Sequence, residues 1–260
     1  MATIQWTSST VTAAGVELHL RRGGQGAPIL LLHRDIGTLD HLPFYDALAQ
    51  THDVFIPHHP GYGKSPRPDW VAHVRDIAVI YRALVGALDL RAATLVGLGF
   101  GGWIAAEMAT FAPVDTARLV LVGAMGVKPP EGDILDQALV SYIEYVRAGF
   151  HDPDGFDRIF GARPSSEQLV QWDICREMSF RVAWKPYMYS DTLPHLLAGT
   201  QARALVIHGD NDQIVPLSAS KLYASRLPNA RQEIVANAGH LVELDQPDAL
   251  ASLITSFISA

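Results

Sequence analysis

The feature with the clearest chemical meaning is a glycine turn at residues 97–102, which reads Gly-Leu-Gly-Phe-Gly-Gly. It follows the apolar run 93–96, which is typical of a buried strand, and it precedes residues 103–109, which favour a helix. A strand, a tight turn and a helix are the setting in which a Gly-x-Ser-x-Gly motif exposes a nucleophilic serine. Here Gly99 stands in the place of that serine. The turn therefore predicts a site for nucleophilic catalysis that lacks the hydroxyl group.

The same six residues also match Gly-x-Gly-x-x-Gly, the dinucleotide-binding pattern. That pattern needs a carboxylate at the end of the following strand, about 20 residues further on, to bind the ribose hydroxyls. The next strand-like run, residues 118–122, leads into Gly-Ala-Met-Gly, and Asp115 lies before this run rather than after it. We therefore disfavour a nucleotide site and expect neither a cofactor nor a metal. A purely structural glycine turn stays an alternative.

Two later loops carry a carboxylate and an imidazole directly after strand-like runs. Residues 205–207 are apolar and lead into a loop with Asp210 and Asp212, and residues 234–235 lead into Ala-Asn-Ala-Gly and then His240. An imidazole that is oriented by a carboxylate can remove a proton from a hydroxyl group or from water. The two loops therefore supply an acid and a base downstream of the glycine turn.

Together these segments resemble the α/β-hydrolase superfamily, and within it the capped esterases and carbon–carbon bond hydrolases. The resemblance extends from the early strands to the His240 loop, and it includes the turn Pro-Gly-Tyr-Gly-Lys-Ser at residues 60–65, whose role in the superfamily is structural. The chain order of nucleophile, acid and histidine is also the order of that fold. The resemblance implies that Gly99 stands at the nucleophile position, with Asp212 as the acid and His240 as the base. Asp210 competes with Asp212 for the role of acid.

The resemblance also implies an oxyanion hole after the apolar run 28–32. Superfamily members continue with His-Gly-x, whereas this chain continues with His33, Arg34 and Asp35. The backbone N–H groups that would bind an oxyanion are those of Asp35 and Phe100. Arg34 replaces a glycine whose small size allows a close backbone approach. Its side chain is either exposed to solvent or positioned as a substrate-binding guanidinium at the mouth of the cleft, where an anionic ligand would meet it.

The elements that must hold these loops alternate between strand-like and helical runs, which is the pattern of a mostly parallel sheet covered by helices on both faces. We expect an α/β-hydrolase fold with a sheet of about eight strands, whose core comprises residues 1–126 and 202–260. Residues 127–201 break the alternation and resemble the helical cap of the superfamily. Within them, the sequence favours helices at 133–147 and 166–181.

A cap controls which molecules reach the site because it covers the cleft and excludes water. Its densest group of large apolar side chains contains Trp184, Tyr187 and Met188, which we expect to line the substrate pocket. Lys185 lies in the same stretch, where it is either solvent-exposed or available to a ligand carboxylate. The single cysteine, Cys175, falls in a helical region and is interpreted as a packing residue rather than a substitute nucleophile.

The composition predicts a globular protein whose partner is a small-molecule substrate or ligand. The 260 residues, 48% of them hydrophobic and 18% charged, suffice for one sizeable core. A formal net charge of −7 argues against nucleic acid and anionic membranes as partners. The start of the chain lacks the features of a signal peptide, and no apolar run is long enough to span a bilayer. With a single cysteine, these features predict a cytoplasmic protein, and a homodimer stays an open alternative.

Three functions fit these residues. In the first, the protein hydrolyses a small ester, lactone or diketone, and His240, oriented by Asp212, activates a water in the space left by the serine side chain. A lyase or isomerase that uses the same base is a variant of this hypothesis. In the second, the protein is a non-catalytic small-molecule binder or interaction protein on a lapsed hydrolase scaffold. The third takes Gly99 as an introduced substitution in an ordinary serine hydrolase. In all three cases the chain as it stands cannot use the acyl-enzyme route, because loss of the serine of such a triad lowers turnover about a million-fold.

Overall fold

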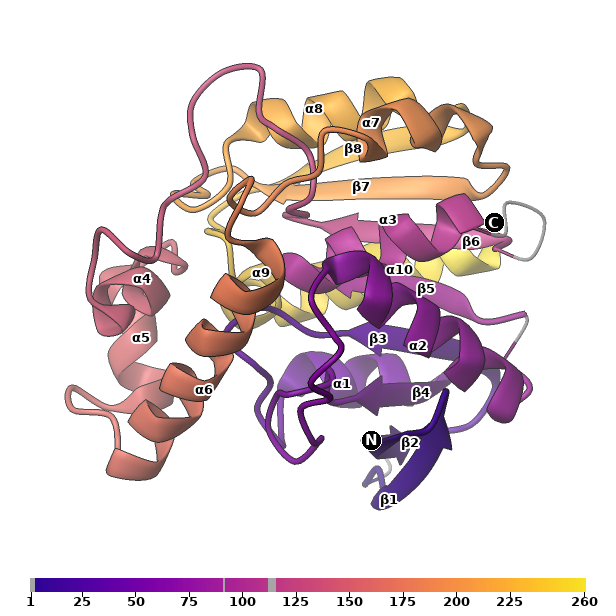
Figure 1. The fold of residues 1–260 in the computed structure, drawn as a ribbon, viewed down its shortest axis with the longest axis horizontal. Helices are drawn as coiled ribbons and strands as arrows, with labels where there is room; N and C mark the ends of the chain where they lie inside the picture. Colours follow the sequence, from indigo (N-terminus) through magenta and orange to yellow (C-terminus); the bar gives the residue numbers. More distant parts are fainter. Residues whose placement is uncertain (1–2, 91, 112–115) are drawn as a thin grey trace.

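An eight-stranded sheet forms the centre of the molecule in the computed structural model, which describes residues 3–90, 92–111 and 116–260 (Figure 1). Its strands are β1 (Trp6–Ala13), β2 (Val16–Gly23), β3 (Ala27–Leu32), β4 (His52–Pro57), β5 (Thr94–Leu98), β6 (Arg118–Val122), β7 (Arg203–Gly209) and β8 (Ala230–Val235). Their order across the sheet is β1-β2-β4-β3-β5-β6-β7-β8. Strand β2 pairs antiparallel with β1 and β4, and the other neighbouring strands run parallel. The predicted α/β-hydrolase fold and its sheet of about eight strands are confirmed, whereas Asp115 lies outside the described residues.

Helices cover both faces of this sheet, which explains why its central strands are almost continuously apolar. All five residues of β5 are buried, whereas β2, near the sheet edge, alternates between buried and exposed positions. One face packs against α1 (Pro43–Ala49) and α10 (Pro247–Ser259). The other face packs against α2 (Val74–Ala87), α3 (Phe100–Phe111) and α8 (Leu217–Arg226). The sheet therefore separates two apolar cores and holds the loops at its strand ends in fixed positions.

Residues 127–201, which we call the insert, lie between β6 and β7. The insert contains α4 (Tyr142–Ala148), α5 (Pro153–Phe160), α6 (Ser166–Ala183), α7 (Leu193–Leu196) and the 3-10 helix η1 (Leu197–Gly199). Helices α4, α5 and α6 stand together at one side of the sheet (Figure 1). The rings of Phe156, Phe160 and Trp172 pack against one another, with centroids 5.0–6.1 Å apart. These rings join α5 to α6, and Tyr142 of α4 packs against the same Trp172 with centroids 6.0 Å apart, so the three helices share an aromatic centre.

The first helix of the insert is shorter than the sequence predicts. A helix is predicted over residues 133–147, but α4 forms only its C-terminal half, because Ser141 caps it with a reciprocal pair of hydrogen bonds to Glu144. Upstream of this cap the chain makes long-range contacts instead, as where the N–H of Leu135 donates to the carbonyl of Ile214 at 2.9 Å. The second predicted helix corresponds to α6. The prediction at 133–147 was wrong because capping and tertiary contacts outweighed helix propensity.

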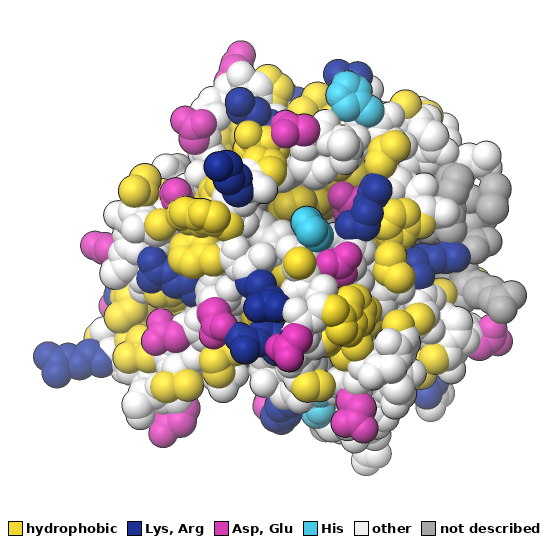
Figure 2. Space-filling model, viewed as in Figure 1, with side chains coloured by type: hydrophobic (Ala, Val, Ile, Leu, Met, Phe, Trp, Pro, Cys, Tyr) yellow, Lys and Arg dark blue, Asp and Glu magenta, His cyan; other side chains and the backbone are white. Residues whose placement is uncertain are grey.

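Charges of both signs are interspersed over the face of the molecule seen in Figure 2, with hydrophobic side chains scattered between them. The longest helix of the described ranges, α6, has 18 residues. Within those ranges, no helix combines the length and the apolar character that crossing a membrane requires.

Candidate functional site

The chain turns from β5 into α3 at Gly99, whose φ is +51°. This left-handed conformation costs an L-residue about 1–3 kcal/mol, and glycine adopts it readily. A close backbone contact explains why residue 101 is also a glycine, because a Cβ there would clash with the carbonyl oxygen of Leu32. Helix α3 begins at Phe100, so the predicted oxyanion donor, its N–H, belongs to the helical turn whose N–H groups have no intrahelical acceptor. The turn therefore has the backbone geometry of a nucleophile elbow.

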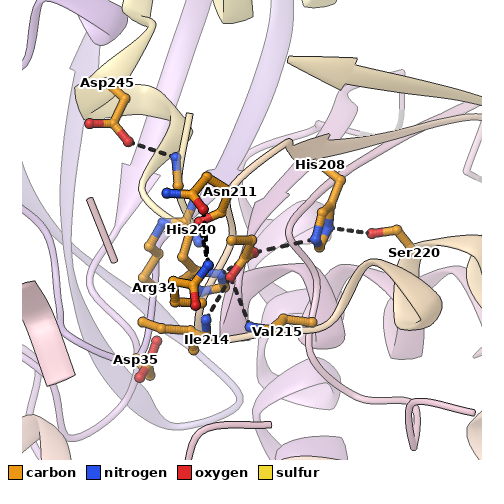
Figure 3. A network of polar contacts seen from close by, with 12 residues as sticks. Arg34, Asp35, His208, Asn211, Ile214, Val215, Ser220, His240 and Asp245 are labelled. Atoms are coloured by element: carbon orange, nitrogen blue, oxygen red, sulfur yellow. Dashed lines mark hydrogen bonds and ion pairs between the residues drawn. The ribbon is translucent and has the colours of Figure 1, made fainter. Parts of the chain in front are cut away.

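Asp212 and His240 meet beside this turn. The Nδ1 atom of His240 lies 2.8 Å from Oδ2 of Asp212, and both side chains are at most 1% exposed. Since an ionised carboxylate can only accept, Nδ1 carries a proton, and in the neutral ring Nε2 is the acceptor. The second oxygen of Asp212 accepts hydrogen bonds from the N–H groups of Ile214 and Val215, both at 2.8 Å (Figure 3). The carboxylate is thus fixed on one side by the backbone and orients the imidazole on the other.

A second imidazole, that of His208, flanks the same carboxylate. Its Nε2 lies 3.7 Å from Oδ2 of Asp212, and its Nδ1 shares a hydrogen bond of 2.7 Å with the hydroxyl group of Ser220 (Figure 3). Burial lowers the pKa of His208. Burial also opposes ionisation of Asp212, but His240 and the nearby hydrogen-bond donors outweigh it, so the pKa of Asp212 is lowered. Asp212 is therefore an anion at neutral pH. Sequence reasoning missed His208, whose only signal is its place four residues before Asp212.

The competing acid, Asp210, does not reach the imidazole of His240. Its Oδ1 accepts a hydrogen bond from the N–H of Ala238 at 3.2 Å, and its side chain is 42% exposed. Asp210 therefore stabilises the loop that precedes His240, and the carboxylate that the structure pairs with His240 is Asp212.

Arg34 lies neither in solvent nor at the mouth of a cleft, contrary to the sequence-based expectation. It is only 2% exposed, and its Nε and Nη2 donate to the two carboxylate oxygens of Glu243 at 2.6 and 2.7 Å. Burial disfavours the charged guanidinium, but Glu243 more than compensates, so the pKa of Arg34 is raised. Glu243 lies in α9 (Val242–Asp245), three residues after His240, and sequence reasoning missed it. The third nitrogen of the guanidinium, Nη1, is buried without a hydrogen-bond partner.

Arg34 and His240 occupy the space that a serine side chain would need. A Cβ on Gly99 would lie 2.9 Å from Nη1 of Arg34 and 3.0 Å from Nε2 of His240. Contacts this short force a neighbour to move, so a serine side chain does not fit at position 99 unless Arg34 or His240 shifts. Gly99 and Arg34, the two residues that depart from the predicted motif, are therefore coupled in space. The arginine fits because residue 99 has no side chain, and Glu243 neutralises its charge.

Asp35 is buried and tied to the insert. Its Oδ2 accepts hydrogen bonds from Nε2 of Gln137 at 2.6 Å and from the hydroxyl group of Tyr145 at 2.8 Å. These bonds hold the loop after β3 against the segment around α4. The backbone N–H of Asp35 remains a predicted oxyanion donor, while its side chain fastens the insert, a role that the sequence did not reveal.

The residues expected to line the pocket do not gather at this site. Trp184 is 49% exposed and packs against a neighbouring ring of α6, and Met188 is fully buried in the main core. The hydroxyl group of Tyr187 donates to the carbonyl of Leu135 at 3.1 Å, so this ring serves the insert. All three follow the C-terminal end of α6. The N-terminal half of that helix is the part that faces the site. Burial raises the pKa of the Cys175 thiol, in keeping with a packing role.

Two adjoining cavities lie between α6 and the loop that follows β3. The smaller, about 40 Å³, is bordered by Arg34, Leu98, Trp172 and Glu243. The larger, about 280 Å³, is bordered by residues that include His58, Lys64, Gln171 and Cys175. The wall common to both is formed by His33, Ile36, Gly37, Thr38, Leu39 and Gln168. The larger cavity has room for a small molecule, and the smaller one, which shares its wall, borders Arg34.

Several known proteins resemble this chain along most of its length. The sequence model described as the Alpha/beta hydrolase family matches residues 29–253. The 2-hydroxymuconate semialdehyde hydrolase of Pseudomonas sp. (strain CF600) is 27% identical over 283 residues, which cover 96% of this chain and 93% of that protein. Among solved structures, the 2-hydroxy-6-oxo-6-phenylhexa-2,4-dienoate hydrolase from Rhodococcus sp. strain RHA1 has a TM-score of 0.79 at 22% identity, covering 99% of this chain and 100% of that chain. A bacterial membrane phospholipase A has a TM-score of 0.83 at 21% identity, and the match covers 98% of this chain and 86% of that chain. At these identities the structural similarity establishes the fold.

Proposed function

Since the chain belongs to the alpha/beta hydrolase family, we propose that it hydrolyses a small activated carbonyl compound, an ester, lactone or diketone, with His240 as the general base. The observation that carries this proposal is the Asp212–His240 pair, which is complete although the nucleophile is absent. Its Nδ1–Oδ2 distance is 2.8 Å, and Nε2 is left without a partner. An unpartnered buried acceptor is costly, which supports a role for it in the reaction.

In the proposed reaction, a water molecule bound to Nε2 of His240 loses a proton to the imidazole while its oxygen attacks the substrate carbonyl carbon. The tetrahedral intermediate then collapses, and the protonated imidazole returns the proton to the leaving group. The anionic Asp212 stabilises the transient imidazolium. No bond to the protein forms at any step, so the absence of a side chain at Gly99 is compatible with turnover. General-base catalysis contributes about 10²- to 10⁴-fold, which suits labile bonds.

The larger cavity supports a route for the substrate along α6. Nε2 of His240 is buried in this structure, so we expect α6 and the loop after β3 to move apart when the substrate enters. Relatives named for the hydrolysis of 2-hydroxymuconate semialdehyde and of 2-hydroxy-6-oxo-2,4-heptadienoate support placing carbonyl compounds with labile carbon–carbon bonds among the candidates.

A non-catalytic small-molecule binder is the second candidate, and the closed state of the site favours it. Arg34 and His240 are 2% and 1% exposed, and together they fill the position at which family members would react. The close fit of Arg34 and Glu243 around Gly99 also supports a natural glycine over an introduced one. A single introduced substitution would leave a gap rather than a filled and neutralised pocket.

Replacing His240 by alanine is expected to abolish the proposed activity, because the base is removed while the fold is kept. Hydrolysis of p-nitrophenyl acetate, γ-butyrolactone and acetylacetone would be measured for the wild type and for His240→Ala. We expect the wild type to be about 10²- to 10⁴-fold faster on at least one substrate. His195→Ala, which changes an exposed histidine of α7, serves as the control and should match the wild type. Equal rates for the wild type and His240→Ala would refute the hydrolase and favour the binder.

A further inference from the structure

We propose that Nη1 of Arg34 binds the carbonyl oxygen of the substrate and stabilises its developing charge, with Glu243 as the positioning residue. This inference rests on the proposed general-base function. It assigns to a side chain the task that backbone N–H groups perform in an ordinary oxyanion hole.

The hydrogen-bond inventory of Arg34 is the first support. A guanidinium has five N–H donors, and the contacts with Glu243 engage Nε and Nη2. Nη1 is buried, carries donors and has no partner. A buried donor without an acceptor costs free energy, and in native structures such groups are rare. A ligand oxygen placed at Nη1 would satisfy it.

The second support is the position of Nη1 relative to the base. Nη1 of Arg34 and Nε2 of His240 lie 2.9 and 3.0 Å from the same point, the place of a Cβ on Gly99. One atom is a cationic donor and the other is an acceptor, and both are unpartnered. Hydrolysis of a carbonyl group requires a hydrogen-bond donor to its oxygen. It also requires a water molecule, activated by the base, to attack its carbon. The two atoms offer these functions side by side.

The third support is the way Glu243 holds the guanidinium. Two parallel hydrogen bonds of 2.6 and 2.7 Å fix the plane of the group, so Nη1 cannot rotate away from Gly99. Glu243 is 5% exposed, and its charge balances that of Arg34 without contacting Nη1. A fixed donor in a water-poor site stabilises developing charge without reorganisation during the reaction. Glu243 thus acts through Arg34.

The test compares the wild type with Arg34→Gln/Glu243→Gln, which removes both charges and leaves neither buried alone. On the fastest substrate of the panel, we expect kcat to fall about 10²- to 10³-fold, the loss seen when one oxyanion donor is removed, with little change in KM. The single variant Glu243→Asp should lower kcat as well, because a shorter carboxylate draws Nη1 away from Gly99. A guanidinium rescue of Arg34→Ala, with equimolar sodium chloride as the salt control, should restore part of the rate. Unchanged kcat in the double variant would overturn the inference.

A binding measurement keeps this inference distinct from the proposed hydrolysis. Acetate, whose oxygens mimic the developing oxyanion, would be titrated calorimetrically into the wild type, the double variant and His240→Ala. We expect at least tenfold weaker binding in the double variant, while His240→Ala retains most of the affinity. If no panel substrate is turned over and acetate binding still depends on Arg34, the hydrolase proposal fails and the anion site stands. Equal acetate affinity in the wild type and the double variant would refute the Arg34 site.

Discussion

Replacing Gly99 by serine is expected to destabilise the protein and to leave it unable to form an acyl-enzyme. The left-handed backbone at this position adds about 1–3 kcal/mol of strain for a non-glycine residue. The new Cβ would also meet Nη1 of Arg34 at 2.9 Å. Arg34 cannot move aside at low cost, because it is buried and held twice by Glu243. The serine hydroxyl would therefore lack the space to align with His240.

The triple variant Gly99→Ser/Arg34→Gly/Glu243→Gln is expected to react where the single variant does not. Arg34→Gly clears the space, and Glu243→Gln removes the charge that would otherwise be buried alone at a cost of about 3–5 kcal/mol. The serine then meets His240 and Asp212, so recovery of the acyl-enzyme route can be worth up to about a million-fold.

Both variants would be treated with a fluorophosphonate, which transfers its phosphonyl group to an activated serine with loss of fluoride, and examined by intact mass. Gly199→Ser is the matched control for a new serine that is remote from His240 and meets no steric conflict, since a Cβ at Gly199 has nothing within 4 Å. Labelling of the single Gly99→Ser variant at the rate of the triple variant would contradict the steric coupling between Gly99 and Arg34.

The sequence predicted the turn at Gly99 and the pair Asp212–His240 because each belongs to a short motif whose order along the chain is itself informative. The partner of Arg34 could not be predicted in this way, because Glu243 lies 209 positions away. The direction of the Arg34 side chain depends on the space beside Gly99, which a motif does not describe. The two off-pattern residues could therefore be noticed from sequence, but their coupling could not.

The pocket was predicted poorly for a related reason. The aromatic content of the insert indicates burial, but it does not indicate which side of α6 faces the cleft. Trp184 lies at the far end of that helix, whereas Trp172 borders the cavity beside Arg34. The contact of Gln137 with Asp35 spans 102 positions and leaves no local signal. Long-range polar contacts of this kind decide the shape of the site, and they require the fold.

Lowering the pH from 7 to 5 is expected to destabilise the protein strongly through two buried histidines next to the loop after β3. The Nε2 of His59 donates to the carbonyl of His33 at 2.8 Å, and its Nδ1 lies 2.6 Å from the hydroxyl group of Tyr81, an arrangement that suits a neutral ring. Burial lowers the pKa of His59 to about 3 and that of His58 to about 4. Both values lie below the ordinary value of about 6.5 that applies to the unfolded chain.

The sign of the effect follows from proton binding. Below pH 6.5 the unfolded chain binds a proton at each histidine, whereas the folded protein does not bind one until the pH approaches 4 for His58 and 3 for His59. The stability is therefore complete above pH 6.5 and is lost as the pH falls from there. Each histidine contributes about 2 kcal/mol of loss by pH 5, since one pKa unit corresponds to about 1.4 kcal/mol. The lowered pKa of Asp212 adds a loss only at more acidic pH, below its unfolded value.

Urea unfolding at pH 7 and pH 5 would measure this loss in the wild type, His59→Gln and the exposed control His195→Gln. A loss of about 4 kcal/mol from the two histidines is a large share of the 5–15 kcal/mol typical of a folded domain. The His59→Gln variant should lose about 2 kcal/mol less than the wild type over this range, because glutamine does not titrate, while His195→Gln should behave as the wild type. Groups that do not contact His59 titrate equally in all three proteins, so the difference reports on His59 and on His33, which stacks against it. Identical losses in the wild type and His59→Gln would show that His59 is already able to take up its proton in the folded protein.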